Sequence, residues 1–305
     1  MNTSFGPFRL AHHTHPGPRE TNQDTVLSIR LPDHRWLLAV ADGMGGLEEG
    51  QLASKTALSA LYRGLSKGLD LETAVREGNA AVNREAKGRE MGTTLVAAVL
   101  SGRRAEFVNV GDSRAYCSDS LGLVQVTRDH TLAEEARRSG DPEVATLDPE
   151  SNRWAAALAR YLGSKEDVEP DRFGPLELTE GAWLLLCTDG LHDVMSLDEI
   201  DGFLRTHSDP QDAALSLVKE ALDRGTRDNV SVALAAWPRP KPGFVPQSSP
   251  PRPESSGGRS RILMSSGRRL RPRKRVGRVV TLFLTIAVLA IALVFLVDWI
   301  RSAGP

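Results

Sequence analysis

Cysteine is nearly absent from the sequence, whose 305 residues include only Cys117 and Cys187. Neither lies in a Cys-x-x-Cys pair or near a histidine at zinc-ligand spacing, so a cysteine-based zinc site is excluded. Two cysteines also cannot build the disulfide framework of a small secreted scaffold. The N-terminal stretch lacks the basic and apolar regions of a signal peptide. We expect reduced thiols in a domain that remains in the cytoplasm.

Phosphate-binding glycine loops are lacking as well. The glycines after Asp42 read GMGGLEEG, which matches neither the G-x-x-x-x-G-K-[ST] of a P-loop nor the G-x-G-x-x-G of a dinucleotide site. An aspartate directly before the glycines would also repel a phosphate group. A nucleotide cradle is therefore excluded here, and Asp42 requires another explanation.

The near-zero net charge of −1 conceals a strong asymmetry. Of the 38 Lys and Arg, 13 follow Trp237, whereas only 2 of the 39 Asp and Glu do so. The chain up to Trp237 therefore carries a net charge of −12, and the tail carries +11. This split indicates an acidic folded domain followed by a basic segment with a different task.

The longest uncharged hydrophobic run lies in this tail. Residues 279–297 are 19 consecutive uncharged residues, a length that crosses a bilayer core as one helix. Residues 268–278 carry seven basic side chains immediately before the run, and positive flanks stay cytoplasmic. The basic cluster could instead bind nucleic acid, but beside a membrane span an orientation signal explains it more simply. We expect a single-pass protein of the cell membrane, with its acidic domain in the cytoplasm and no nucleic-acid partner.

The sequence predicts five parts. They are a globular domain (1–237), a linker (238–267), a basic juxtamembrane segment (268–278), a transmembrane helix (279–297) and a short extracytoplasmic tail (298–305). The linker is rich in Pro, Ser and Gly, a composition that suits a semi-extended tether and cannot build a core.

Within residues 1–237, apolar runs of strand length are grouped with amphipathic helical patterns. Predicted strands occupy 35–41, 182–188 and 229–237, and residues 92–102, 104–118 and 122–127 are predicted to be three successive strands or hairpin arms. Predicted helices include one with Leu58, Leu61 and Leu65 on one face and another over 71–86. Thr131 with Glu134, Ser196 with Glu199, and Asp209 before Pro210 indicate three further helix starts. Strands that occur in runs favour an α+β domain with layered antiparallel sheets.

Aspartates accompany several of these apolar runs. Asp42, Asp112 and Asp189 follow a run, Asp228 precedes one, and Asp24 lies in the stretch RETNQDT. A single aspartate at a strand end is usually a turn former. Several that converge repel one another, so an ionised cluster needs bound cations.

Oxygen ligands without His or Cys select Mg²⁺ or Mn²⁺ over zinc. Two such ions about 3.5–4 Å apart can share a water molecule, lower its pKa and bind phosphate oxygens during in-line displacement. The pattern therefore predicts metal-assisted phosphoryl hydrolysis. Gly43, which lacks a Cβ, would let its own carbonyl approach an ion closely.

Six ordered motifs carry a resemblance to a known family. RETNQD, ADGMGG, MGTTLVAAVL, VNVGDSRAY, LLLCTDGLHDVMS and TRDNVSV, spread over residues 10–237, are similar to those of the bacterial branch of type 2C metal-dependent Ser/Thr protein phosphatases. The resemblance implies a sandwich of two antiparallel β-sheets flanked by pairs of helices, with a dinuclear Mn²⁺ or Mg²⁺ centre between the sheets. It implies hydrolysis of phosphoserine and phosphothreonine by a metal-bound water, without a phospho-enzyme. The implied partners are phosphorylated proteins and eukaryotic-like bacterial Ser/Thr kinases, and we expect a monomer.

The resemblance also implies roles for the matching residues. Asp42 would bridge the two ions, and Gly43 would offer its backbone carbonyl. Asp189 and Asp228 would be the other ligands of the pair. Asp112 would join Asp189 in holding a third, weaker ion found in bacterial members.

Two further residues would act on water and substrate. Asp24 would hold metal-bound water, and Arg19 would bind the substrate phosphate through its bidentate guanidinium. The chain departs from the family at Gln23, where a carboxylate is usual, and by one residue missing before Arg19. It also has Met44 where animal members place a histidine proposed as general acid. A thioether cannot donate a proton, so we expect the leaving group to take its proton from metal-bound water.

The remaining observations concern loops and alternatives. His130 directly precedes a predicted helix start, which favours a loop-ordering role over proton transfer. Residues 139–163 are less regular and are similar to the family's flap beside the active site. Two other functions stay open at this point, a membrane-anchored pseudophosphatase that binds phosphoproteins and a small-molecule phosphatase. The intact predicted ligands favour an enzyme.

Overall fold

The structure is a computed structural model that describes residues 8–237, except residues 47, 119–121, 141–154 and 165–166. The predicted linker, basic segment, transmembrane helix and tail lie outside the described residues. Within the described part of the chain, no helix is long and apolar enough to cross a membrane.

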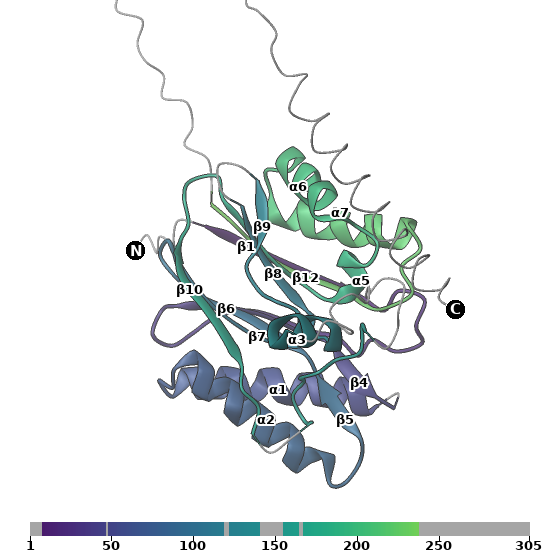
Figure 1. Ribbon diagram of the computed structural model, residues 1–305. Coiled ribbons are helices and arrows are strands. Elements are labelled where there is room, and N and C mark those ends of the chain that lie inside the picture. Colours follow the sequence, from purple (N-terminus) through teal and green to yellow (C-terminus); the bar gives the residue numbers. More distant parts are fainter. Residues whose placement is uncertain (1–7, 47, 119–121, 141–154, 165–166, 238–305) are drawn as a thin grey trace, which may run out of the picture. The chain divides into compact units, whose positions relative to one another are not determined.

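Two five-stranded antiparallel sheets form the centre of the domain (Figure 1). The first sheet has the order β1 (Arg9–His15), β12 (Val230–Ala236), β11 (Trp183–Cys187), β8 (Arg114–Ser118) and β9 (Leu123–Gln125). The second has the order β10 (Asp171–Glu177), β7 (Arg104–Val110), β6 (Leu95–Ser101), β3 (Trp36–Ala41) and β2 (Thr25–Arg30). A short ribbon pairs β4 (Gly43–Gly45) with β5 (Met91–Thr93).

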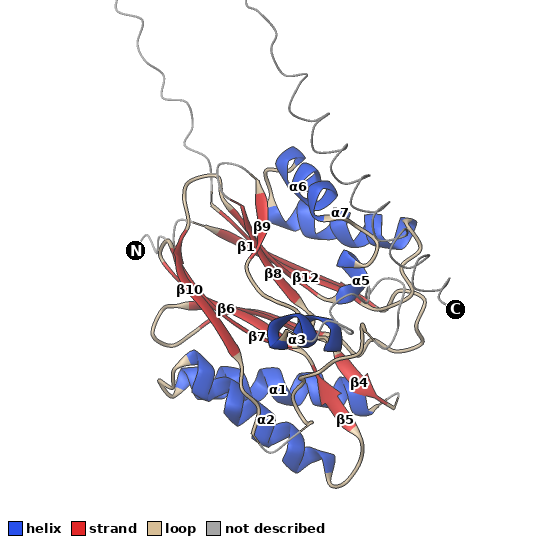
Figure 2. Cartoon of the chain, viewed as in Figure 1, coloured by secondary structure: helices blue, strands red, loops and turns tan. Residues whose placement is uncertain are grey.

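Helices cover the outer face of each sheet (Figure 2). Helices α1 (Glu49–Ser66) and α2 (Leu71–Ala86) pack on the second sheet, and α6 (Leu197–Thr206) and α7 (Pro210–Asp223) pack on the first. Two shorter helices, α3 (Leu132–Ser139) and α5 (Asp189–His192), lie near the strand ends. The predicted α+β sandwich flanked by helix pairs is therefore confirmed.

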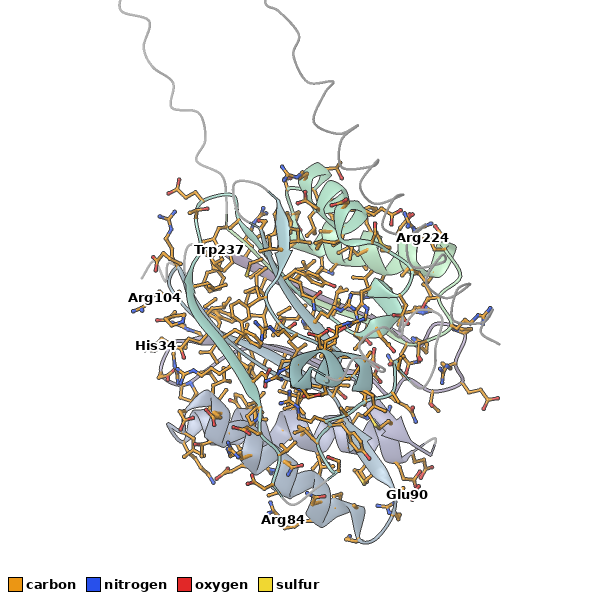
Figure 3. The ribbon with its side chains drawn as sticks, in the orientation of Figure 1. His34, Arg84, Glu90, Arg104, Arg224 and Trp237 are labelled. Atoms are coloured by element: carbon orange, nitrogen blue, oxygen red, sulfur yellow. The ribbon has the colours of Figure 1, made fainter. Side chains whose placement is uncertain are left out.

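Strand β3 shows how the sequence specifies these layers. Leu38 and Val40 lie in the core between the two sheets, whereas Leu37 and Ala39 face the helices α1 and α2. Because both faces of the strand are buried, its sequence is a continuous apolar run and does not alternate with polar residues. Charged side chains such as Arg84, Arg104 and Arg224 lie at the periphery instead (Figure 3).

Several predicted helix boundaries are confirmed. The predicted helix over 71–86 is α2, whose first turn is capped by Asp70, which accepts the Thr73 N–H. Ser196 and Glu199 form the predicted capping box of α6. Asp209 accepts backbone N–H groups at the start of α7.

The prediction of one strand over 104–118 was wrong. Strands β7 and β8 belong to different sheets, and the chain crosses between them at residues 111–113. Gly111 has a φ of +109°, and a Cβ there would lie 2.7 Å from the Thr94 side chain. Only glycine fits this turn. The crossing places Asp112 between the two sheets.

Candidate active site

Strand register explains why aspartates far apart in the sequence lie together. Thr25 pairs with Ala41 across β2 and β3, so Asp24 and Asp42 lie at the same end of the second sheet. In the first sheet, Cys187 of β11 pairs with Arg114 on one side and with Val232 on the other. Because neighbouring strands lie about 5 Å apart, the segments that hold Asp112, Asp189 and Asp228 meet at one end of the first sheet.

Threonine side chains join the ends of the two sheets. Thr94 Oγ1 accepts the Asp42 N–H at 2.9 Å and lies 2.8 Å from Ser113 Oγ, beside Asp112. The Asp42 carbonyl accepts the Thr94 N–H at 2.9 Å and the Thr93 hydroxyl at 2.8 Å. Both backbone groups of Asp42 are therefore hydrogen-bonded, which fixes the position of its main chain at the end of β3.

A second set of contacts holds Asp24. The Thr188 hydroxyl donates to Asp24 Oδ2 at 3.0 Å, and Thr188 Oγ1 accepts the Ser231 N–H at 3.0 Å. Thr188 also precedes Asp189, so one residue connects Asp24 of the second sheet with the end of β11 and the start of β12. Neither Thr188 nor Thr94 was predicted, because nothing in their local sequence reveals the partners, distant along the chain, that they contact in the fold.

The aspartates interact electrostatically. Burial, followed by the charges of Asp24, Asp189, Asp112 and Asp228, raises the pKa of Asp42 well above its ordinary value. Burial is also the main cause that raises the pKa of Asp24 to about 7 and that of Asp112 to about 6. Burial and the charge of Asp112 raise the pKa of Asp189. The fold therefore concentrates negative charge where water cannot fully stabilise it.

These residues fit hard divalent cations. Asp24 Oδ1 and Asp189 Oδ1 are buried and have no hydrogen-bond partner among the described residues. Their donors are oxygens, which suit Mg²⁺ and Mn²⁺. Within residues 8–237, apart from the gaps, no three or more His, Cys, Asp or Glu side chains are placed so that together they could hold a metal ion. The carboxylates thus lie close enough for their charges to interact, but three or more of them do not surround one ion position.

Gly43 also has a steric role, which its local sequence does not indicate. A Cβ on Gly43 would lie 2.0 Å from the Gly50 carbonyl oxygen and 2.7 Å from that of Gln23. The start of α1 therefore packs directly on this backbone. The side chain of Gln23, the position that departs from the family, donates to the Gly46 carbonyl at 2.8 Å and so braces the glycine turn.

Arg19 lies beside Asp228 at the rim of the site. Its guanidinium contacts Asp228 Oδ2 at 2.7 Å, and its Nε donates to the Arg227 carbonyl at 2.8 Å. Its side chain is 53% exposed, so it is accessible to a substrate. The structure therefore brings Arg19 together with the predicted aspartates.

A cysteine nucleophile is excluded. Cys117 and Cys187 are both buried, and burial raises the pKa of both thiols. A thiol held in its protonated form is a poor nucleophile.

Comparison with known proteins identifies the family. A family model described as Protein phosphatase 2C matches residues 12–237. This chain belongs to the protein phosphatase 2C family. The serine/threonine phosphatase Stp of Listeria welshimeri is 32% identical over 241 residues, which cover 74% of this chain and 91% of Stp.

Solved structures agree with this assignment. The serine/threonine phosphatase of Streptococcus agalactiae superposes with a TM-score of 0.67 at 28% identity, covering 75% of this chain and 99% of that one. The catalytic domain of PstP, solved with two manganese ions, has a TM-score of 0.62 at 33% identity, covering 75% and 97%. The chain is a serine/threonine protein phosphatase that acts on phosphorylated proteins.

Proposed function

We propose that this phosphatase hydrolyses phosphoserine and phosphothreonine by direct attack of water, using two divalent cations held between its sheets. The convergence of Asp24, Asp42, Asp112 and Asp189, whose pKa values are all raised chiefly by burial, is the observation that carries the proposal. Mn²⁺ or Mg²⁺ in this position supplies the Lewis acidity that activates water and neutralises phosphate charge.

Each residue has a defined task in this proposal. Asp42, whose carboxyl interacts with those of the four other aspartates, would hold the two cations together with Asp189 and Asp228. The backbone carbonyl of Gly43 would be a further ligand of the cations. Asp24 orients the attacking water, since its Oδ1 is unpaired among the described residues while Thr188 fixes its Oδ2. Arg19 binds the incoming phosphate at the rim.

The leaving alkoxide needs a proton that Met44 cannot supply. Met44 lies in β4, one residue beyond Gly43, and is partly exposed. We assign the proton to solvent beside Asp112 and Asp189, the residues that would hold a third cation. A Brønsted plot over aryl phosphates tests this assignment. A steep slope for wild type that becomes flat in Met44→His would contradict it, because the leaving group would then receive no proton until a histidine supplies one.

Substrate comparison tests the activity. We expect a phosphothreonine peptide to be hydrolysed with Mn²⁺ or Mg²⁺ and sugar phosphates to be poor substrates. Asp189→Asn should reduce kcat/KM by more than about 100-fold, because even the loss of a partner of a metal ligand costs 10–100-fold. Hydrolysis that survives in Asp189→Asn or in chelator would refute the cation mechanism. A wild-type protein that binds the phosphopeptide without turnover would favour a pseudophosphatase.

We further propose a membrane tether. The 19 uncharged residues at 279–297 and the seven basic residues at 268–278 support a single C-terminal helix with the domain (1–237) on the cytoplasmic side. The phosphatase would then act, as a monomer, near membrane Ser/Thr kinases and oppose them. The full chain should sediment with membranes and a chain ending at residue 267 should not. Equal sedimentation of both would refute the tether.

A further inference from the structure

Hydrogen bonds to Gly111 hold the loop that carries Asp112. Gly111, directly before Asp112, donates its N–H to His130 Nδ1 at 3.1 Å. The Gly111 carbonyl accepts the His130 N–H at 3.0 Å and the Asn109 side-chain amide at 3.0 Å. Both the N–H and the carbonyl of Gly111 are therefore hydrogen-bonded to His130, which lies about twenty positions further along the chain.

The ring of His130 needs one particular tautomer to make this contact. Nδ1 must keep a lone pair to accept the Gly111 N–H, so the ring proton sits on Nε2. His130 is completely buried, and Nε2 lies 3.4 Å from Asp171 Oδ2, an electrostatic contact that is too poorly aligned to count as a hydrogen bond. The negative charge of Asp171 favours the proton on the nitrogen that faces it.

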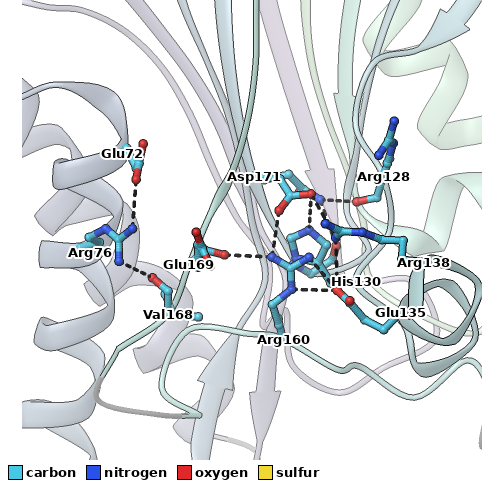
Figure 4. A network of polar contacts seen from close by, with 12 residues as sticks. Glu72, Arg76, Arg128, His130, Glu135, Arg138, Arg160, Val168, Glu169 and Asp171 are labelled. Atoms are coloured by element: carbon cyan, nitrogen blue, oxygen red, sulfur yellow. Dashed lines mark hydrogen bonds and ion pairs between the residues drawn. The ribbon is translucent and has the colours of Figure 1, made fainter. Parts of the chain in front are cut away.

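Asp171 is in turn held by an arginine (Figure 4). Arg160 contacts Asp171 Oδ1 at 2.9 Å and Glu135 of α3 at 2.6 Å. Asp171 also pairs with Asn109 across β10 and β7, so its position is fixed by the second sheet. The contacts run from Arg160 through Asp171 and His130 to Gly111.

The segment that contains Arg160 also runs beside His130. The Ala159 N–H donates to the His130 carbonyl at 2.8 Å, and Thr131 forms a bridge with Leu158. The Leu162 N–H and carbonyl exchange hydrogen bonds with Thr93, whose hydroxyl bonds to the Asp42 carbonyl. This segment therefore reaches both Asp42 and the Asp112 loop.

We propose that His130 is a positioning residue that orients Asp112 for cation binding, and that Asp171, supported by Arg160, holds His130 in the required tautomer. The inference rests on the proposed function, in which Asp112 binds the weakest cation. His130 touches neither substrate nor cation and acts only through the Gly111 peptide. Partners that orient a metal ligand typically change metal affinity by 10–100-fold.

The test measures Mn²⁺ binding directly by titration calorimetry and Mn²⁺ electron paramagnetic resonance, together with phosphopeptide hydrolysis over a range of Mn²⁺ concentrations. His130→Ala should weaken the weakest Mn²⁺ site by about 10-fold or more. His130→Asn should retain most of the affinity, because its Oδ1 can replace Nδ1 as acceptor. His130→Gln, which reaches towards Asp171 but cannot accept the Gly111 N–H, should resemble the alanine variant. His207→Asn at the end of α6 is the matched control and should bind Mn²⁺ as wild type does.

The possible results separate this inference from the proposed function. Unchanged Mn²⁺ binding in a folded His130→Ala, with weakened binding in Asp112→Asn, would overturn the inference alone. Unchanged binding in Asp112→Asn would overturn the role of Asp112 and with it this inference, while wild-type hydrolysis would still support the proposed function. If His130→Ala does not fold, Asp171→Asn and Arg160→Gln replace it. Weakened Mn²⁺ binding in both supports the inference, and unchanged binding in both overturns it.

Discussion

The phosphatase without bound cations is expected to lose stability as the pH rises from 5 to 8. Burial is the main cause that raises the pKa of Asp24 to about 7 from its ordinary 3.8. The folded protein therefore keeps a proton that the unfolded chain has already lost. As pH rises through the folded pKa this proton leaves, and the free energy of unfolding falls.

The magnitude follows from the two pKa values. The folded carboxyl is almost fully protonated at pH 5 and almost fully ionised at pH 8, whereas the unfolded one is ionised throughout. Linkage then gives a loss of about 2–3 kcal/mol for this one group. A domain of this size shifts its Tm by about 2–4 °C per kcal/mol, so we expect a fall of roughly 5–10 °C.

Differential scanning calorimetry in chelator, at constant ionic strength, measures this slope. Asp24→Asn is the matched variant and should show a shallower fall, because its amide does not titrate. Added Mn²⁺ should reverse the trend, since cations compete with protons for the carboxylates. A Tm in chelator that is constant or rises over this pH range, or a slope unchanged in Asp24→Asn, would refute the reasoning.

Three further perturbations test individual contacts. Gly43→Ala should lose at least about 1–3 kcal/mol of stability and most activity, because its Cβ would lie 2.0 Å from the Gly50 carbonyl oxygen. Gly202→Ala on α6 has open space around the added Cβ and should preserve activity. Equal Tm values for the two variants would contradict this prediction. Thr188→Val removes the donor to Asp24 and the acceptor of the Ser231 N–H, so chemical denaturation should show a free energy of unfolding lower by about 1–3 kcal/mol. Thr206→Val, at an exposed position, should lower it far less. A Thr188→Val protein as stable as wild type would contradict this prediction. Asp42→Asn should raise the Tm in chelator, because it removes a buried carboxyl that the neighbouring aspartates repel when it is ionised. The same substitution should abolish the stabilisation by Mn²⁺. An increase in its Tm on adding Mn²⁺ would show that Asp42 is not a ligand.

Local signals in the sequence were enough for much of the fold. Helix α2 begins and ends where predicted, because Asp70 caps it and its apolar residues recur with helical spacing. Strand β10 was missed, since it is an edge strand of mixed burial that contains Gly174 and Pro175. Strands β7 and β8 were merged because both are apolar, and only the pairing of distant strands assigns them to different sheets.

The same distinction holds for the site. Asp42, Asp112, Asp189 and Asp228 stood out in the sequence because each lies beside an apolar run and next to Gly, Ser or Asn. The supporting residues could not be predicted, because Thr188 meets Asp24 across 164 positions and Thr94 meets Asp42 across 52. Arg19 was predicted to bind phosphate, and its contact with Asp228 depends on the turn after β1. The role of Gly43 was interpreted as carbonyl access, whereas the structure adds close packing against Gly50.

The central claim is that the clustered aspartates bind cations that the reaction requires. A Mn²⁺ titration of the chelated wild-type protein tests it most directly, with bound Mn²⁺ counted by electron paramagnetic resonance and phosphate release from a phosphothreonine peptide measured in the same samples. We predict that at least two ions bind per chain and that hydrolysis appears in step with their binding. Full hydrolysis in chelator, or binding of fewer than two ions by an active protein, would contradict the account.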